Sequence, residues 1–152
     1  MPFDVNQFAP TDIVGRCLNP AYGQRIEAEY FGSAAINVCA PCKFVSGTNP
    51  ANVSVDKITA DTELPTAGIL IYDSSKRNTY NKGQYVTLAR VGSIIGLEAS
   101  AAITADQKIS ITADGKAATS TATKNVIGIA MNDAAKNAVV RVLLVEPYIA
   151  TA

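Results

Sequence analysis

Short β-rich runs separated by turn residues make up the sequence from Arg25 onward, and almost no window keeps a helical period for the length that a helix needs. Glycine and proline interrupt the chain between these runs, which is typical of turns. The pattern therefore predicts an all-β protein. The expected strands are residues 26–30, 53–58, 69–72, 85–91, 94–97, 108–112, 117–121, 127–131 and 139–145.

The connections between these runs carry two further signals. Asp114-Gly115 is a two-residue hairpin signal, because both residues tolerate the positive φ that a type I′ turn requires. The alanine-containing segments 99–105 and 134–137 are each long enough for about one helical turn, which is too short to bury a face alone. We expect these two segments to be caps or connectors.

A weak internal repeat occurs at an offset of 60 positions. Residues 68–76 align with residues 128–136 and match at Gly, Ile, Asp and Lys, and a β-branched strand follows each copy. Upstream, Lys43-Phe44-Val45-Ser46 and Lys108-Ile109-Ser110-Ile111 occupy similar places. The repeat indicates two pseudo-symmetric halves of one barrel or sandwich, an arrangement that closes strand edges which would otherwise invite aggregation.

The last expected strand is apolar on both faces. Val140, Val142 and Leu144 share one face, whereas the other face carries Leu143 and two valines around Arg141. Such a strand is either central in a two-layer core or covered by another subunit. On the second interpretation, Val140, Val142 and Leu144 are candidate interaction residues.

The first 24 residues differ from the rest, with apolar side chains spaced among Pro, Asn and Gly without a clear period. We interpret residues 1–24 as an extended arm that precedes a single β-barrel or β-sandwich domain at residues 25–152. The arm is either a strap across its own barrel or an anchor that docks Phe3 and Phe8 on a neighbouring subunit. Deletion of residues 1–8 should separate the two: a strap is needed for folding, an anchor only for attachment.

Charge and hydropathy narrow the classes of partner. The 13 basic and 13 acidic residues leave no net charge to attract nucleic acid or an anionic membrane. No apolar stretch approaches the roughly 18–20 residues that span a bilayer, and the first residues lack the features of a signal peptide. We expect synthesis in a cytoplasm and partners that are proteins.

The residues available for chemistry are few. Histidine is absent, which excludes Ser-His-Asp and Cys-His pairs and mixed Cys/His zinc sites. Cys39-Ala40-Pro41-Cys42 has the spacing of a redox dithiol or of half a zinc site, but no helix is expected after it and only Cys17 remains as a further thiol.

Ser54 and Lys57 have the spacing of the Ser-x-x-Lys pair in some serine acyl-enzymes, but in a strand their side chains point to opposite sides. We expect structural cysteines, no catalytic residue, no metal, no cofactor and no small-molecule substrate.

The pattern of the last two-thirds of the chain resembles the head decoration proteins of tailed bacteriophages, which are also called structural cement proteins. The resemblance rests on the Gly83–Gly92 run, the alanine-containing corner at 99–105, the hairpin around Asp114-Gly115, the strand around Gly128 and the final valine-rich strand. These motifs consist of common strand and turn residues.

The resemblance implies a structural virion protein without enzymatic activity. It would bind the exterior of an icosahedral capsid, commonly as a homotrimer, and bridge subunits of the major capsid protein after synthesis in the cytoplasm of a bacterial host. Two alternatives remain. One is a receptor-binding or fibre-like module, with Tyr80 among Arg77 and two lysines as the place to look; the other is a small Cys-x-x-Cys redox or metal protein.

Overall fold

The computed structural model describes residues 13–19, 23–72 and 77–151, and its regular elements are strands. This part of the chain contains no helix that is long and apolar enough to cross a membrane. The strands are β1 Arg25–Tyr30, β2 Ile36–Asn37, β3 Pro41–Val45, β4 Ser54–Lys57, β5 Gly68–Ile71, β6 Thr79–Tyr80, β7 Tyr85–Ala89, β8 Ile94–Glu98, β9 Lys108–Ile111, β10 Ala117–Thr119, β11 Asn125–Ala130 and β12 Val139–Ile149.

Every expected run contains a strand, which confirms the all-β class. The two short alanine-containing segments are not helical. Instead, Ile103 and Ala134 pair in an antiparallel bridge, and each backbone N–H donates to the other's carbonyl at 2.8 and 2.9 Å. Long-range backbone pairing has replaced the local helical bonds, so the segments are connectors as expected.

The hairpin around Asp114-Gly115 differs from the expected type I′ turn. Of the two residues only Gly115 has a positive φ, 81°. The Thr112 N–H donates to the Lys116 carbonyl at 2.9 Å, which leaves a three-residue loop instead of a two-residue one. A loop of this length needs the left-handed conformation at one position, and glycine adopts it without a steric penalty.

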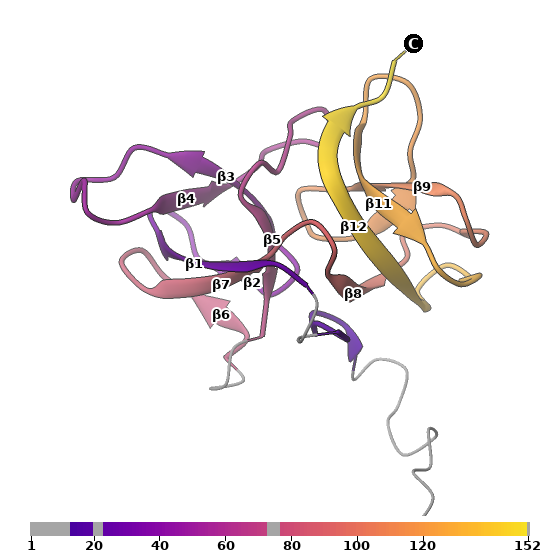
Figure 1. Cartoon of the computed structure of the whole chain (residues 1–152), viewed down its shortest axis with the longest axis horizontal. Helices are drawn as coiled ribbons and strands as arrows, with labels where there is room; N and C mark the ends of the chain where they lie inside the picture. Colours follow the sequence, from indigo (N-terminus) through magenta and orange to yellow (C-terminus); the bar gives the residue numbers. More distant parts are fainter. Residues whose placement is uncertain (1–12, 20–22, 73–76, 152) are drawn as a thin grey trace, which may run out of the picture.

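Most of the strands form two five-stranded units that lie side by side (Figure 1). The first is a closed barrel, and the second is a curled sheet that we call the C-terminal barrel, because one bridge joins its two ends. In the N-terminal barrel, the order β1-β4-β3-β5-β7 closes through a parallel pair between β1 and β4. The C-terminal sheet has the order β10-β9-β11-β12-β8. Its end strands also meet in parallel, because Ala99 forms a bridge with Ala117 directly after β8.

The two barrels are repeats of one topology. Strands β8, β9, β10, β11 and β12 occupy the places that β1, β3, β4, β5 and β7 hold in the N-terminal barrel. The offset of 60 found in the sequence carries Gly68, the start of β5, onto Gly128 in β11. The repeat is therefore real, but the halves do not combine into one barrel, because the parallel pairing lets each half close around its own core.

Strand β5 joins the two cores. Leu70 lies in the N-terminal core, whereas Ile69 and Ile71 belong to the cluster of the C-terminal barrel. Their exposed fractions are only 2% and 1%, so β5 is buried on both faces. Burying a side chain of this size stabilises a fold by roughly 1.5–3 kcal/mol, and two such residues make a substantial contact between the barrels.

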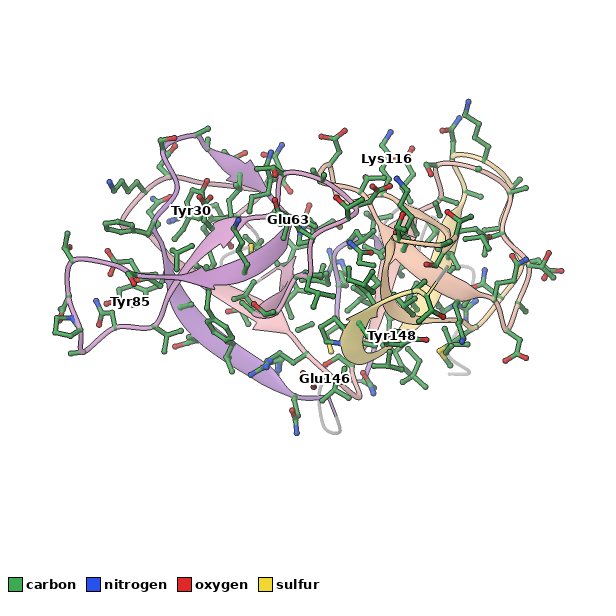
Figure 2. The ribbon with its side chains drawn as sticks, turned by 90° about the horizontal axis from the view of Figure 1, so that it is seen from above. Tyr30, Glu63, Tyr85, Lys116, Glu146 and Tyr148 are labelled. Atoms are coloured by element: carbon green, nitrogen blue, oxygen red, sulfur yellow. The ribbon has the colours of Figure 1, made fainter. Side chains whose placement is uncertain are left out.

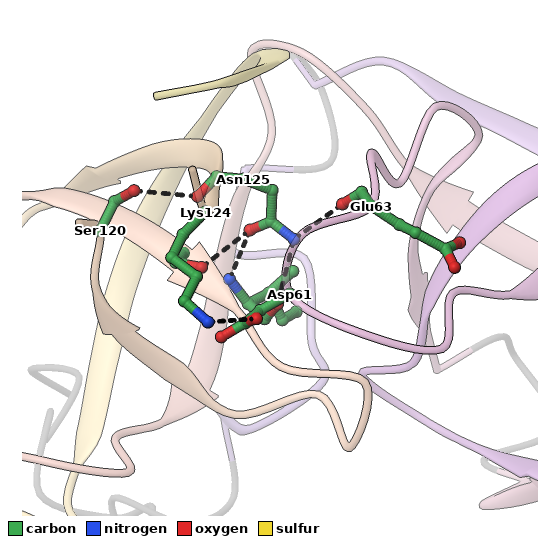
Figure 3. A network of polar contacts seen from close by, with 7 residues as sticks. Asp61, Glu63, Ser120, Lys124 and Asn125 are labelled. Atoms are coloured by element: carbon green, nitrogen blue, oxygen red, sulfur yellow. Dashed lines mark hydrogen bonds and ion pairs between the residues drawn. The ribbon is translucent and has the colours of Figure 1, made fainter. Parts of the chain in front are cut away.

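A buried amide provides the polar part of this contact (Figure 3). Asn125, at the start of β11, is fully buried. Its Nδ2 donates to the carbonyls of Glu63 and Ile111 at 3.0 and 3.1 Å. Its Oδ1 accepts from Ser110 Oγ and the Ile111 N–H at 3.0 and 2.9 Å. Because Glu63 lies in the loop between β4 and β5, the amide connects the N-terminal half to the C-terminal barrel.

The same loop is held from outside by ion pairs. Lys124 Nζ lies 2.7 Å from Asp61 Oδ1, and Lys43 Nζ lies 3.0 Å from Glu63 Oε2. The Thr59 hydroxyl and Lys43 hold the pKa of Glu63 below its usual value. All four charged side chains are partly exposed, so each pair contributes little compared with the buried amide.

Residues 13–19 pair with β8 along the edge that β12 does not use. Val14 bridges Gly96 in parallel, Cys17 bridges Ile95, and the Asn19 side chain binds the Ile94 N–H at 2.6 Å. The Tyr72 N–H also donates to the Gly15 carbonyl at 2.9 Å, so this segment touches both barrels. The described part of the arm is thus a strap on its own chain, while residues 1–12 lie outside the described residues.

We predict that Asn125→Ala lowers the free energy of unfolding by about 2–4 kcal/mol, because it removes the partners of several buried backbone groups at once. Urea unfolding followed by tyrosine fluorescence measures the loss. Asn81→Ala, at an exposed asparagine, is the matched control and should change stability by less than about 0.5 kcal/mol. Equal stability of the two variants would mean that the amide does not hold the barrels together.

Candidate interaction surface

The interaction residues expected on β12 are in the core. The exposed fractions of Val140, Val142 and Leu144 are 0%, 0% and 4%, and all three belong to the cluster inside the C-terminal barrel. Between β8 and β11, this face of β12 points inward, where Val140 lies opposite Leu97 and Val142 opposite Ile95. These side chains therefore stabilise the fold and are not available to a partner.

Tyr80 is also buried. It pairs with Ile36 across β2 and β6, has an exposed fraction of 0%, and lies in the core of the N-terminal barrel. The Arg77 guanidinium lies 5.6 Å from the centre of its ring. Tyr80 therefore cannot contact a receptor in this fold. Phe3 and Phe8, the two anchors expected in the arm, lie outside the described residues.

The opposite face of β12 is exposed and apolar. Leu143 lies in register with Ile94 on β8 and with Ile129 on β11, and Ile129 is in register with Lys108 on β9. Leu18 extends this row, since its N–H donates to the Ile94 carbonyl at 2.7 Å. The apolar side chains of this row lie on β8, β12, β11 and the strap, and Lys108 on β9 ends the row. Together with Met131, we call these apolar side chains the apolar stripe.

Large side chains of the stripe are accessible to solvent. The exposed fractions are 49% for Met131 and 37% for both Leu143 and Leu18. Tyr148 borders the stripe with 41% exposure, and the Lys108 ammonium lies 5.9 Å from the centre of its ring. Contiguous apolar side chains of this kind, bordered by polar groups, mark protein contact surfaces.

The candidate interaction residues expected from the sequence lie on the face of β12 that the structure buries. A strand alternates strictly, so exchanging the inner and outer faces moves every side chain by one position. The signal that identifies the outer face is Arg141, which is exposed between Val139 and Leu143. A charged residue flanked by apolar ones faces solvent, because burial of an unpaired charge is costly.

The N-terminal barrel carries a second exposed surface on β1 and β7. Tyr85 is 60% exposed, and its register partner on β1 is Glu29. Glu27 lies on the same face, and Val53, whose carbonyl accepts from the Glu29 N–H, is 49% exposed. We call this surface the acidic face. Figure 2 shows Tyr85 on one barrel and Tyr148 on the other, far apart.

The cysteine pair is divided between the two cores. Cys42 lies in the N-terminal core and Cys39 in the cluster of the C-terminal barrel, and both are free thiols. Burial raises the pKa of each thiol to about 12, with smaller contributions from Glu98 at Cys39 and Asp56 at Cys42. Thiols protonated at neutral pH are poor nucleophiles and poor metal ligands.

The other candidate residues for catalysis or metal binding are not brought together in the described part of the chain. Ser54 is buried while Lys57 is partly exposed on the alternate position of β4. An open groove of about 570 Å³ lies where Cys39, Tyr72 and Glu98 meet, and Glu98 is 3.8 Å from Lys116 Nζ. Within residues 13–19, 23–72 and 77–151, no three His, Cys, Asp or Glu side chains are placed to hold a metal ion together.

Comparison with known proteins identifies a matching family and a similar fold. The sequence model for phage cement proteins matches residues 51–145. The fold is similar to that of the head fiber gp8.5 N base in bacteriophage phi29, with a TM-score of 0.54 and 12% sequence identity. The similarity covers 84% of this chain and 98% of that chain. No curated protein matches the sequence.

We predict opposite effects for neighbouring substitutions on β12. Val142→Asp places a carboxylate in the core and should cost more than about 4 kcal/mol, enough to prevent folding. Leu143→Asp changes the stripe and should cost about 1 kcal/mol, because the carboxylate stays in solvent. Thermal unfolding by circular dichroism measures both, and a severe loss for Leu143→Asp would show that the stripe is part of the core.

We also predict unequal reactivity of the three thiols. In the folded protein at pH 8, the partly exposed Cys17 should react with a disulfide reagent first, while Cys39 and Cys42 react only after unfolding. Mass spectrometry after timed labelling, with and without zinc, measures this order. Rapid labelling of Cys39 or Cys42 in the folded protein would favour a redox or metal-binding role for the Cys-x-x-Cys motif. Protection of these thiols from labelling by zinc would favour the same role.

Proposed function

This chain belongs to the phage cement protein family, and we propose that it binds the outside of an icosahedral phage capsid and bridges subunits of the major capsid protein. The observation that carries the proposal is the family match, which runs from just before β4 to near the middle of β12 and so includes most of both repeats. The chain is thus a structural, capsid-associated phage protein, and the bridging of subunits is the part that we propose.

Two features of the molecule support this role. The apolar stripe offers a contact that does not depend on charge, which suits a permanent protein interface better than capture of a charged ligand. The balance of 13 basic and 13 acidic residues leaves the chain without net charge, so neither nucleic acid nor an anionic membrane is favoured.

The mechanism follows from mass action. A protein that binds the assembled shell and not its separated subunits stabilises the shell by RT ln(1 + [L]/Kd) at each site, about 2.7 kcal/mol when its concentration is a hundred times Kd. Several linked contacts multiply the effect, because the second contact forms at a high effective concentration. We propose self-association, with a homotrimer as the expected form, to supply these contacts.

The arm and the place of synthesis complete the proposal. We propose that Phe3 and Phe8 anchor the chain to a neighbouring subunit, and that the protein is made in the bacterial cytoplasm before it joins the virion exterior. The backbone pairing of residues 13–19 with β8 supports a division of the arm, in which we propose that the attachment role belongs to the residues before this strap.

A fibre-like module is the second candidate. It is favoured by the fold similarity to the head fiber gp8.5 N base, which covers 84% of this chain. On this candidate the acidic face around Tyr85 would be available for a ligand, in place of the buried Tyr80. The chain would then attach to the capsid without necessarily stabilising it.

Co-sedimentation with capsids that lack the protein tests the proposal. We expect saturable binding that raises the temperature at which the shells disrupt. We expect Leu143→Asp to weaken binding at least tenfold, because it removes the self-association that links several capsid contacts. Phe44→Asp, at a residue 45% exposed on β3 of the other barrel, is the matched control and should bind as the unmodified protein does. Binding without a change in shell stability would favour the fibre-like module. No binding to the capsids would exclude both the bridging role and the fibre-like module.

A further inference from the structure

We propose that the apolar stripe of one copy docks on the acidic face of a second copy, so that copies associate head to tail. This inference rests on the proposed self-association and identifies the two surfaces that form it. Two independent observations carry it. The repeat relates the stripe to a face that a barrel covers elsewhere in the chain, and the cations beside Leu143 and Ile129 are opposite in charge to the two glutamates of the acidic face.

The repeat relates the stripe to a contact that already exists within the chain. The offset of 60 carries Ile69 onto Ile129 and Ile71 onto Met131. In the first repeat these side chains are 2% and 1% exposed, because the neighbouring barrel covers them. In the second repeat Met131 is 49% exposed and Ile129 is partly exposed.

The exposed face of β11 is therefore the equivalent of the covered face of β5. The same topology presents apolar residues at the same two positions, but in the described residues Met131 is 49% exposed and Ile129 is only partly buried. A barrel of a second copy can occupy the vacant position. Its N-terminal barrel is the unit left to fill it, since the C-terminal barrel of that copy already covers its own β5.

Charge complementarity selects the surface on that barrel. Two exposed cations, Arg141 and Lys108, border the stripe beside Leu143 and Ile129, while the exposed Asp133 lies two residues beyond Met131. The acidic face presents Glu27 and Glu29, which are about 7 Å apart along β1 because a strand rises roughly 3.3 Å per residue. Arg25 lies at the start of the same strand, about 7 Å from Glu27 and about 13 Å from Glu29, so the acidic character is greatest at Glu29 beside Tyr85.

The aromatic ring adds a specific contact. Tyr85 is the most exposed large apolar side chain of the described residues, at 60%. An arginine placed over such a ring gains a cation–π interaction in addition to its ion pair. Arg141 docked between Tyr85 and Glu29 would satisfy both, while Leu143 and Val53 exclude water around it. Apolar centres with a charged rim are typical of specific interfaces.

The two surfaces are different, so the contact is heterologous. Such contacts close into rings when the rotation between copies permits and continue as filaments when it does not. A ring agrees with the proposed homotrimer, and each copy would then use its stripe once and its acidic face once.

Charge reversal tests the pairing. Arg141→Glu and Glu29→Arg should each raise the self-association Kd at least tenfold, and the double variant should return it to within about threefold of the unmodified protein. Sedimentation velocity over a range of concentrations, at low and physiological salt, measures the Kd. Lys136→Glu, an equal charge change at an exposed turn, is the control and should leave the Kd unchanged.

Glu27→Arg provides a second partner for Arg141→Glu should Glu29→Arg disturb the fold, because the Glu29 carboxylate also accepts from Asn52 Nδ2 at 2.9 Å. Three outcomes would overturn the inference. The single variants could associate as tightly as the unmodified protein, the double variant could fail to recover association, or the unmodified protein could stay monomeric.

The capsid assay, run in parallel, separates this inference from the proposed function. Arg141→Glu that loses self-association but still binds capsids weakly supports the inference. Arg141→Glu that self-associates normally but loses capsid binding would mean that the stripe contacts the capsid directly, which would overturn the inference and leave the proposed function intact.

Discussion

Burial of β5 on both faces is the constraint on which the arrangement of the molecule depends. Strand β5 has three adjacent large apolar side chains, and both of its faces are covered because the C-terminal barrel packs on the side opposite the N-terminal core. Leu70 fills one core while Ile69 and Ile71 fill the other. The two barrels consequently share a buried apolar contact and are not independent domains joined by a linker.

Apolar burial alone would not orient the two barrels, because hydrophobic contacts have little directionality. The Asn125 amide supplies the direction, since it must meet the Glu63 carbonyl and the Ile111 backbone at the same time. A buried amide with all its partners is stable, and any other relative position of the barrels would leave polar groups buried without partners. Apolar packing therefore supplies most of the free energy of the contact between the barrels, and the Asn125 hydrogen bonds fix the relative orientation of the barrels.

The same repeat unit serves two purposes within one chain. In the N-terminal barrel, the C-terminal barrel covers the outer apolar face of the repeat unit. In the C-terminal barrel the equivalent face, at Ile129 and Met131, is left open. A chain of two repeats thus buries one such face and presents another, which is a physical basis for assembly that needs no additional motif. The family to which the chain belongs is one in which assembly on a capsid is the expected task.

The sequence by itself determined the strand content, the repeat and the absence of histidine chemistry, because alternation, turn residues and composition are local properties. Only the tertiary structure decided that each repeat closes on itself, that Val142 points inward and Leu143 outward, and that Cys39 and Cys42 belong to different cores. These facts depend on which strands meet across the barrels. Pairing between residues far apart in the chain is a global property, and a strand that is apolar on both faces carries no local mark of which face will be covered.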